Sequence, residues 1–275
     1  MTDSARVLSG LAINRSAPAA ILALTMFLLP AAGVPSELML QDTLKSMLLV
    51  FGVLSAALLL LWQQARRPEP MFWHGVMYVP LLLLAYALGS MGWSHAYLAG
   101  VEAVRWFILA LLLWVSLNAL RQPSHTRLLL WGLHGGAIAA SIWAALQFWW
   151  GFDLLPQFAA PASSFINRNF YAEYAVSVVP FSLYLLATLR RTTWLIPTAL
   201  SIAFNLVALM MTGTRSALIA LLLVFAVVAL VIVRYGQPLA LAKWGRRQRL
   251  LAGLTLLLGV VVMGTIPSNN DAVLL

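Results

Sequence analysis

Long apolar runs, separated by short polar breaks, make up most of this 275-residue chain. Most runs are close to the ~20 residues that an α-helix needs to cross a bilayer. They lie at approximately 17–34, 44–62, 71–92, 98–120, 128–150, 170–189, 192–212, 216–233 and 250–266. The pattern predicts an all-α fold: a polytopic transmembrane helical bundle of about nine spans, forming a single transmembrane domain over 1–275.

Composition agrees with a membrane protein and removes several kinds of chemistry. Apolar residues make up 62% of the chain and charged residues only 9%, whereas a soluble domain carries roughly 25% charged residues. The absence of cysteine excludes a disulfide, a zinc ribbon and a thiol nucleophile. No glycine-rich phosphate loop or metal-ligand cluster interrupts the apolar pattern, so we expect neither a cofactor nor a metal.

The positions of the basic residues predict the orientation. Thirteen of the 17 lysines and arginines lie before the first run or in alternate connections: Arg6, Arg15, Arg66, Arg67, Arg121, Arg127, Arg190, Arg191, Arg234, Lys243, Arg246, Arg247 and Arg249. The positive-inside rule therefore predicts a cytoplasmic N-terminus, a periplasmic C-terminus and a multi-pass protein of a bacterial inner membrane. Residues 151–169 become a periplasmic loop and 234–249 a basic cytoplasmic loop, which we interpret as contacting anionic lipids rather than nucleic acid.

Four basic residues break this rule and fall on the predicted outer side: Lys45, Arg105, Arg168 and Arg215. A charge at bilayer depth costs a few kcal/mol, so such groups usually face a cavity or a partner. Arg105 lies three residues after Glu102, on the same face of a predicted helix. We favour an internal ion pair for these two residues over a direct role in binding a ligand.

Arg168 lies between Asn167 and Asn169, where the predicted outer loop enters the sixth span. Amide and guanidinium donors at one place suit an anionic, oxygen-rich ligand such as a diphosphate. The alternative is an N-cap at Asn167 or Asn169, with Arg168 extending to lipid head groups. Glu173, five residues on, could pair with an arginine or act as a carboxylate base.

Arg215 lies in a very short predicted outer turn, Met211-Thr212-Gly213-Thr214-Arg215-Ser216. Thr214 could cap the following helix, which would leave Arg215 in its first turn. A cation there opposes the helix dipole, so this placement favours a nearby anion. The alternative is an arginine that only contacts lipid phosphate.

Together these motifs resemble the O-antigen ligase and polymerase superfamily of bacterial envelope glycosyltransferases. Phe165-Ile166-Asn167-Arg168-Asn169-Phe170-Tyr171-Ala172, with Pro180 beyond it, is similar to the family's first motif, and Thr212-Gly213-Thr214-Arg215-Ser216-Ala217 to its second. Trp93-Ser94 precedes the arginine-bearing fourth span, as in such proteins. The likeness covers about 70–235. It departs from the family at Ser164 and Ser216, where glycines are expected.

The resemblance implies an inverting, metal-independent glycosyl transfer at the periplasmic face, in the biosynthesis of lipopolysaccharide or another envelope polysaccharide. The donor would be a glycan on undecaprenyl diphosphate, and the acceptor lipid A core, a growing polysaccharide or a protein. Arg215 and Arg168 would bind the diphosphate and stabilise its charge, with Asn167, Asn169, Thr214 and Arg105 as further candidates. Glu173 would be the candidate base, with His95 as a second.

Two other interpretations stay open. The same arginines could bind an anionic solute in a transporter or flippase, although internal repeats typical of transporters are not evident. A non-catalytic membrane scaffold is the third possibility. Members of the family usually continue with a large, histidine-bearing outer loop and further spans. We therefore expect this chain to be either the N-terminal part of a longer protein or a short relative.

Overall fold

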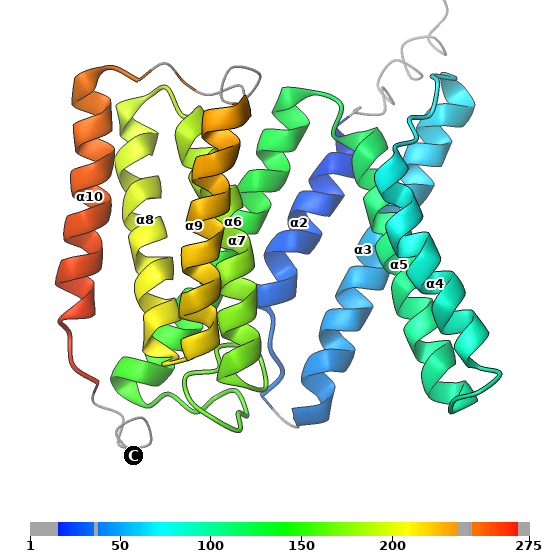
Figure 1. The fold of residues 1–275 in the computed structure, drawn as a ribbon, viewed down its shortest axis with the longest axis horizontal. Coiled ribbons are helices and arrows are strands. Elements are labelled where there is room, and N and C mark those ends of the chain that lie inside the picture. The colour runs from blue at the N-terminus through cyan, green and yellow to red at the C-terminus, as the bar shows by residue number, and fades with distance from the viewer. Residues whose placement is uncertain (1–15, 36–37, 236–241, 243, 269–275) are drawn as a thin grey trace, which may run out of the picture. The chain divides into compact units, whose positions relative to one another are not determined.

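A computed structural model describes residues 16–35, 38–235, 242 and 244–268 (Figure 1). Within these ranges the structure is helical, apart from loops and one isolated bridge between Ala159 and Asn167. The helices are α2 (Ala17–Ala31), α3 (Leu38–Arg66), η1 (Gly75–Met77), α4 (Tyr78–Ser90), α5 (Ala96–Ala119), α6 (Pro123–Trp150), α7 (Arg168–Thr188), α8 (Thr192–Met211), α9 (Arg215–Tyr235) and α10 (Arg246–Gly264). The prediction of an all-α fold is confirmed.

Seven of these helices are long and apolar enough to cross a membrane: α3, α5, α6, α7, α8, α9 and α10. Every apolar run of the sequence coincides with a helix, but two of the helices are shorter than their runs. With 15 residues, α2 is ~22 Å long, less than the ~30 Å of bilayer hydrocarbon. Nine spans and the orientation of the termini remain predictions.

The run 71–92 becomes helical only at Gly75, and Phe72 near its start is paired with Asn118 of α5. The Asn118 amide accepts a hydrogen bond from the Phe72 N–H (2.8 Å) and donates to the Phe72 carbonyl (3.1 Å). Arg121 adds donors to Asn118 Oδ1 (2.6 Å) and to the Pro70 carbonyl (2.8 Å). These bonds satisfy main-chain groups that would otherwise form helix.

The chain forms two compact units, with α2, α3 and α6 each contributing residues to both. Unit 1 comprises the described residues of Met1–Thr25 and Leu48–Leu129. Its core joins α2, α3 and α5 through Leu22, Ala56, Ala57, Leu60, Val115 and Ala119. A Cβ at Gly52 would lie 2.0 Å from Thr25 Oγ1. Because glycine has no side chain, α3 can approach α2 closely at this point.

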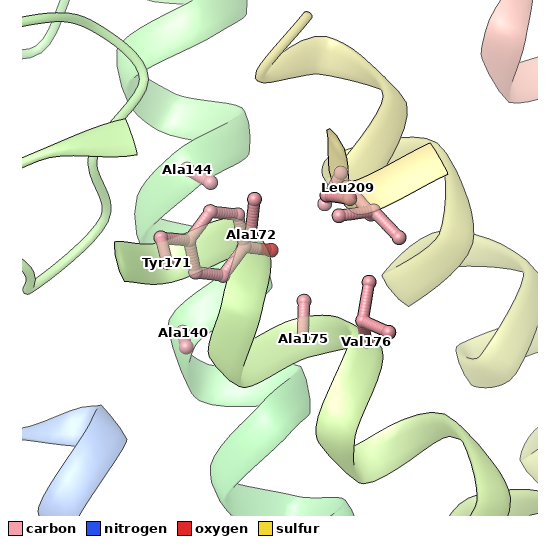
Figure 2. Packing of buried hydrophobic residues seen from close by; sticks show 9 residues of the cluster. Ala140, Ala144, Tyr171, Ala172, Ala175, Val176 and Leu209 are labelled. Carbon is pink, nitrogen blue, oxygen red and sulfur yellow. The ribbon is translucent and has the colours of Figure 1, made fainter. Parts of the chain in front are cut away.

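Unit 2 comprises the described residues of Met26–Met47 and Leu130–Leu275. One core cluster joins α6, α7, α8 and α9: Ala140, Ala144, Tyr171, Ala172, Ala175, Val176, Ala208, Leu209 and Ala217. Figure 2 shows the Tyr171 side chain of α7 beside Ala144 and Ala140, with Leu209 of α8 nearby. A second cluster packs α7 and α8 against α10. Small residues dominate the first cluster, which lets the helices approach closely.

The basic residues of unit 2 separate between its two ends. At one end, the α7–α8 connection meets the start of α10: Trp244 Nε1 donates to the Leu189 carbonyl and Gln248 Nε2 to the Arg190 carbonyl, both at 2.8 Å. This end carries Arg190, Arg191, Arg234, Arg246, Arg247 and Arg249. Arg168 and Arg215 begin α7 and α9 at the opposite end (Figure 1). Within unit 2, this separation agrees with the predicted sidedness.

Candidate functional site

The two sequence motifs meet in the structure. α7 and α9 run in parallel, and α8 returns the chain between them, so both helices begin at the same end of unit 2 (Figure 1). There the hydroxyl of Thr214 donates to the Asn169 Oδ1 atom at 3.0 Å. Asn169 is the neighbour of Arg168, and Thr214 is the neighbour of Arg215. One hydrogen bond thus joins segments 45 residues apart, next to both candidate arginines. We call this end of unit 2, from Asn167 to Asn169 and from Thr212 to Arg215, the motif end.

Small residues below this bond explain why the two helices come so close. Ala172 and Ala175 of α7 share a buried cluster with Ala217, in the first turn of α9. The α8–α9 turn is closed by Gly213, whose φ of +63° lies in the left-handed region that glycine adopts without strain. Thr212 is buried, and its Oγ1 atom accepts a hydrogen bond from the Thr214 N–H at 3.2 Å. The turn therefore holds Thr214 towards α7.

Asn167 is the N-cap of α7. Its backbone is extended, and its Oδ1 atom accepts a hydrogen bond from the Asn169 N–H at 2.9 Å. The capping alternative proposed from the sequence is therefore confirmed for Asn167, and this oxygen is engaged in the cap. Asn169 instead directs its Oδ1 atom to α9.

Arg168 and Arg215 are each the first residue of their helix, and both are exposed. Over the described part of the chain, neither guanidinium has a hydrogen bond or a carboxylate partner. Two positive charges thus stand at the positive ends of two helix dipoles, which is unfavourable without an anion. This arrangement suits an anionic group that can accept hydrogen bonds from both arginines.

Glu173 and Arg105 are placed differently. The Glu173 side chain, on the second turn of α7, is exposed and forms no ion pair with an arginine among the described residues. Arg105 belongs to unit 1, where its Nη1 atom lies 2.6 Å from Glu102 Oε1. The predicted internal ion pair is confirmed. Both of its side chains are largely exposed, so it contributes little to stability.

Lys45 forms a half-buried anchor next to the first motif; the sequence indicated only that it is a cation on the unexpected side, without its partners. Its ammonium donates to the carbonyls of Leu29 (2.8 Å) and Ala32 (3.1 Å) and to Ser164 Oγ (3.0 Å). It also lies 4.6 Å from the centroid of the Phe165 ring. The carbonyls at a helix C-terminus lack intrahelical donors and carry the negative end of the dipole. Lys45 therefore caps α2 and ties it to the loop that leads into α7.

Two more side chains donate hydrogen bonds to the last carbonyls of α2. Ser164 Oγ donates to the Pro30 carbonyl at 2.5 Å, and Trp143 Nε1 donates to the Ala31 carbonyl at 3.1 Å. Ser164 stands where the resemblance leads one to expect glycine. Here its hydroxyl is fully buried and has a specific partner on each side. The serine is thus part of the anchor.

Gln147 holds Ser163, the residue before Ser164, in an unusual backbone conformation. Ser163 has φ +59°, in the left-handed region that costs a non-glycine residue about 1 kcal/mol or more. The Gln147 amide accepts from the Ser163 N–H (2.6 Å) and donates to its carbonyl (2.9 Å). Ser163 Oγ donates to the Ala140 carbonyl at 2.6 Å. Together, Lys45 and Gln147 fix the course of the loop just before Asn167.

Comparison with known proteins adds no relative. No family model, no curated protein sequence and no solved structure matches this chain. The residues of the motif end and their geometry are therefore the evidence for a function.

Proposed function

We propose that this protein is a membrane glycosyltransferase of the O-antigen ligase type, acting at the periplasmic face of a bacterial inner membrane. Its donor would be a glycan on undecaprenyl diphosphate, and its acceptor lipid A core, a growing polysaccharide or a protein. The observation that carries the proposal is the 3.0 Å hydrogen bond between Thr214 and Asn169, which brings the two arginine motifs together.

Glycosyl transfer from a lipid diphosphate requires cationic hydrogen-bond donors beside the departing diphosphate. An acceptor hydroxyl attacks the anomeric carbon, the bond from this carbon to the diphosphate oxygen breaks, and the diphosphate leaves with the electron pair. The hydroxyl proton passes to a base, for which Glu173 is our candidate in this chain. Arg168 and Arg215, exposed and free of carboxylate partners in the described ranges, can stabilise the developing negative charge.

The first experiment measures lipid diphosphate binding to the purified protein in detergent, as protection against thermal unfolding by undecaprenyl diphosphate. We expect Arg168→Ala and Arg215→Ala each to reduce this protection at least tenfold in ligand concentration. Arg191→Ala is the matched control, because Arg191 lies at the opposite end of unit 2. Equal protection of all four proteins would contradict the assignment of the two arginines.

The second experiment measures transfer in cells that supply the lipid-linked glycan. Arg168→Ala and Arg215→Ala should abolish glycan on the acceptor, whereas Arg191→Ala should retain it at equal expression. Thr214→Val should lower transfer by about tenfold, because it removes the bond to Asn169 and keeps both charges. Transport of an anionic solute into proteoliposomes, without any glycan product, would instead favour the transporter or flippase. Normal transfer by both alanine variants would contradict the proposed role of the two arginines.

A further inference from the structure

A small cavity lies inside unit 2, between α6, α7 and α8. Its volume of about 10 Å³ corresponds to roughly one water molecule. Apolar residues of the three helices form part of its wall. Polar side chains also line it: Ser141, Tyr171, Tyr174, Ser182 and Asn205.

Two of the polar atoms around this cavity have no protein partner. The Tyr174 hydroxyl and the Asn205 Oδ1 atom are both buried and form no hydrogen bond. Asn205 as a whole is only 6% exposed. The other polar groups are satisfied: Tyr171 bonds Ser141 at 2.9 Å, and Ser182 bonds His134 Nδ1 at 3.0 Å. Among the described residues, both unsatisfied atoms thus belong to side chains that line this cavity.

An empty cavity would destabilise the fold, because it would leave two buried polar atoms without hydrogen bonds. A buried polar atom without a partner costs the full penalty of its desolvation, and lipid supplies no water to helices that span a bilayer. Cavities that remain dry are apolar, whereas polar cavities of this size normally hold water with two to four partners.

We propose that this cavity is a binding site for one structural water molecule. The water donates one hydrogen to Asn205 Oδ1 and forms a second hydrogen bond with the Tyr174 hydroxyl. The hydroxyl groups of Ser182 and Tyr171, which line the same space, can accept or donate further hydrogen bonds. The lining carries no charge, so the site suits a neutral hydrogen-bonding molecule, and its volume admits nothing larger than water. The bound water joins α7 to α8 below the motif end.

The sign of a stability change tests this proposal. If the cavity is dry, Tyr174→Phe removes an unsatisfied hydroxyl and keeps the ring, so the protein should become as stable or more stable. If water is bound, the same change removes a satisfied group, and the unfolding temperature should fall by about 2–4 °C. Tyr184→Phe is the matched control, because Tyr184 lies on the same helix but outside the cavity lining.

A double-mutant cycle and a measurement on the unaltered protein complete the test. Asn205→Leu should also lower the unfolding temperature, and the double variant should lose less than the sum, because one water serves both residues. X-ray radiolytic labelling of the unaltered protein should modify Tyr174, since bound water is the local source of hydroxyl radicals. An unfolding temperature of Tyr174→Phe at or above that of the unaltered protein, or a Tyr174 that stays unlabelled, would overturn the proposal.

Discussion

Replacement of Lys45 by methionine tests whether the half-buried ammonium stabilises the fold or only adds a desolvation cost. Methionine keeps most of the volume and the unbranched shape, but it donates no hydrogen bond. The carbonyls of Leu29 and Ala32 and the hydroxyl of Ser164 would each lose a donor. The negative end of the α2 dipole would also lose its cation.

The magnitude follows from opposing terms. Each carbonyl left without its donor costs ~1–3 kcal/mol. Losing the cation from the helix end costs up to ~2 kcal/mol, and losing the contact with the Phe165 ring costs ~1–2 kcal/mol. Removal of this half-buried charge recovers a desolvation cost of several kcal/mol at most. We expect a net loss of ~2 kcal/mol, which at ~2–4 °C per kcal/mol lowers the unfolding temperature by ~4–8 °C.

The assay is thermal unfolding of the purified protein in detergent, followed by the intrinsic fluorescence of its 11 tryptophans. Arg105→Met is the matched control, because it also removes a cation from a helix but acts on an exposed ion pair. It should cost under ~1 kcal/mol. If Lys45→Met unfolds at or above the temperature of the unaltered protein, desolvation outweighs the helix cap and our reasoning about this anchor is wrong.

Two further predictions concern helix packing and orientation. Gly136→Ala should lower the free energy of unfolding by ~1–3 kcal/mol, because the new Cβ would lie 2.7 Å from Pro30 Cγ and 2.8 Å from the Met26 carbonyl oxygen. The control is Gly253→Ala in α10, where the new Cβ meets no atom within 4 Å. This variant should unfold at an unchanged or higher temperature. Because the chain lacks cysteine, single replacements report orientation directly: an impermeant thiol reagent should label Asp153→Cys in intact cells and Ser124→Cys only after permeabilisation, and the reverse result would contradict the predicted topology.

The helical architecture was predictable because it depends on long apolar runs, a signal that a single sequence carries without ambiguity. The same holds for local contacts. The Glu102–Arg105 pair and the cap at Asn167 both join residues within three positions of each other, where helix geometry limits the possibilities. The run 71–92 shows the limit of this approach. Its first residues are apolar enough for a helix, but Asn118, 46 residues away, pairs with Phe72 instead.

The long-range part of the site could not be read from spacing. The partners of Lys45 are main-chain carbonyls at the end of α2 and a serine 119 residues away, and no sequence motif encodes such a set. The one available signal was a lysine near the start of an apolar run, which by itself is costly in a membrane. The sequence suggests Thr214 as a possible helix cap and a candidate diphosphate ligand, but its bond to Asn169 of α7, 45 residues away, could not be predicted.

The return of the chain from Asn169 to Thr214 depends on two helices of nearly equal length. α7 has 21 residues and α8 has 20, so each covers ~30 Å and the second undoes the rise of the first. One residue inserted into either helix would displace everything after it by ~1.5 Å and rotate it by ~100°. The number of residues between the two arginines is therefore fixed by the lengths of α7 and α8.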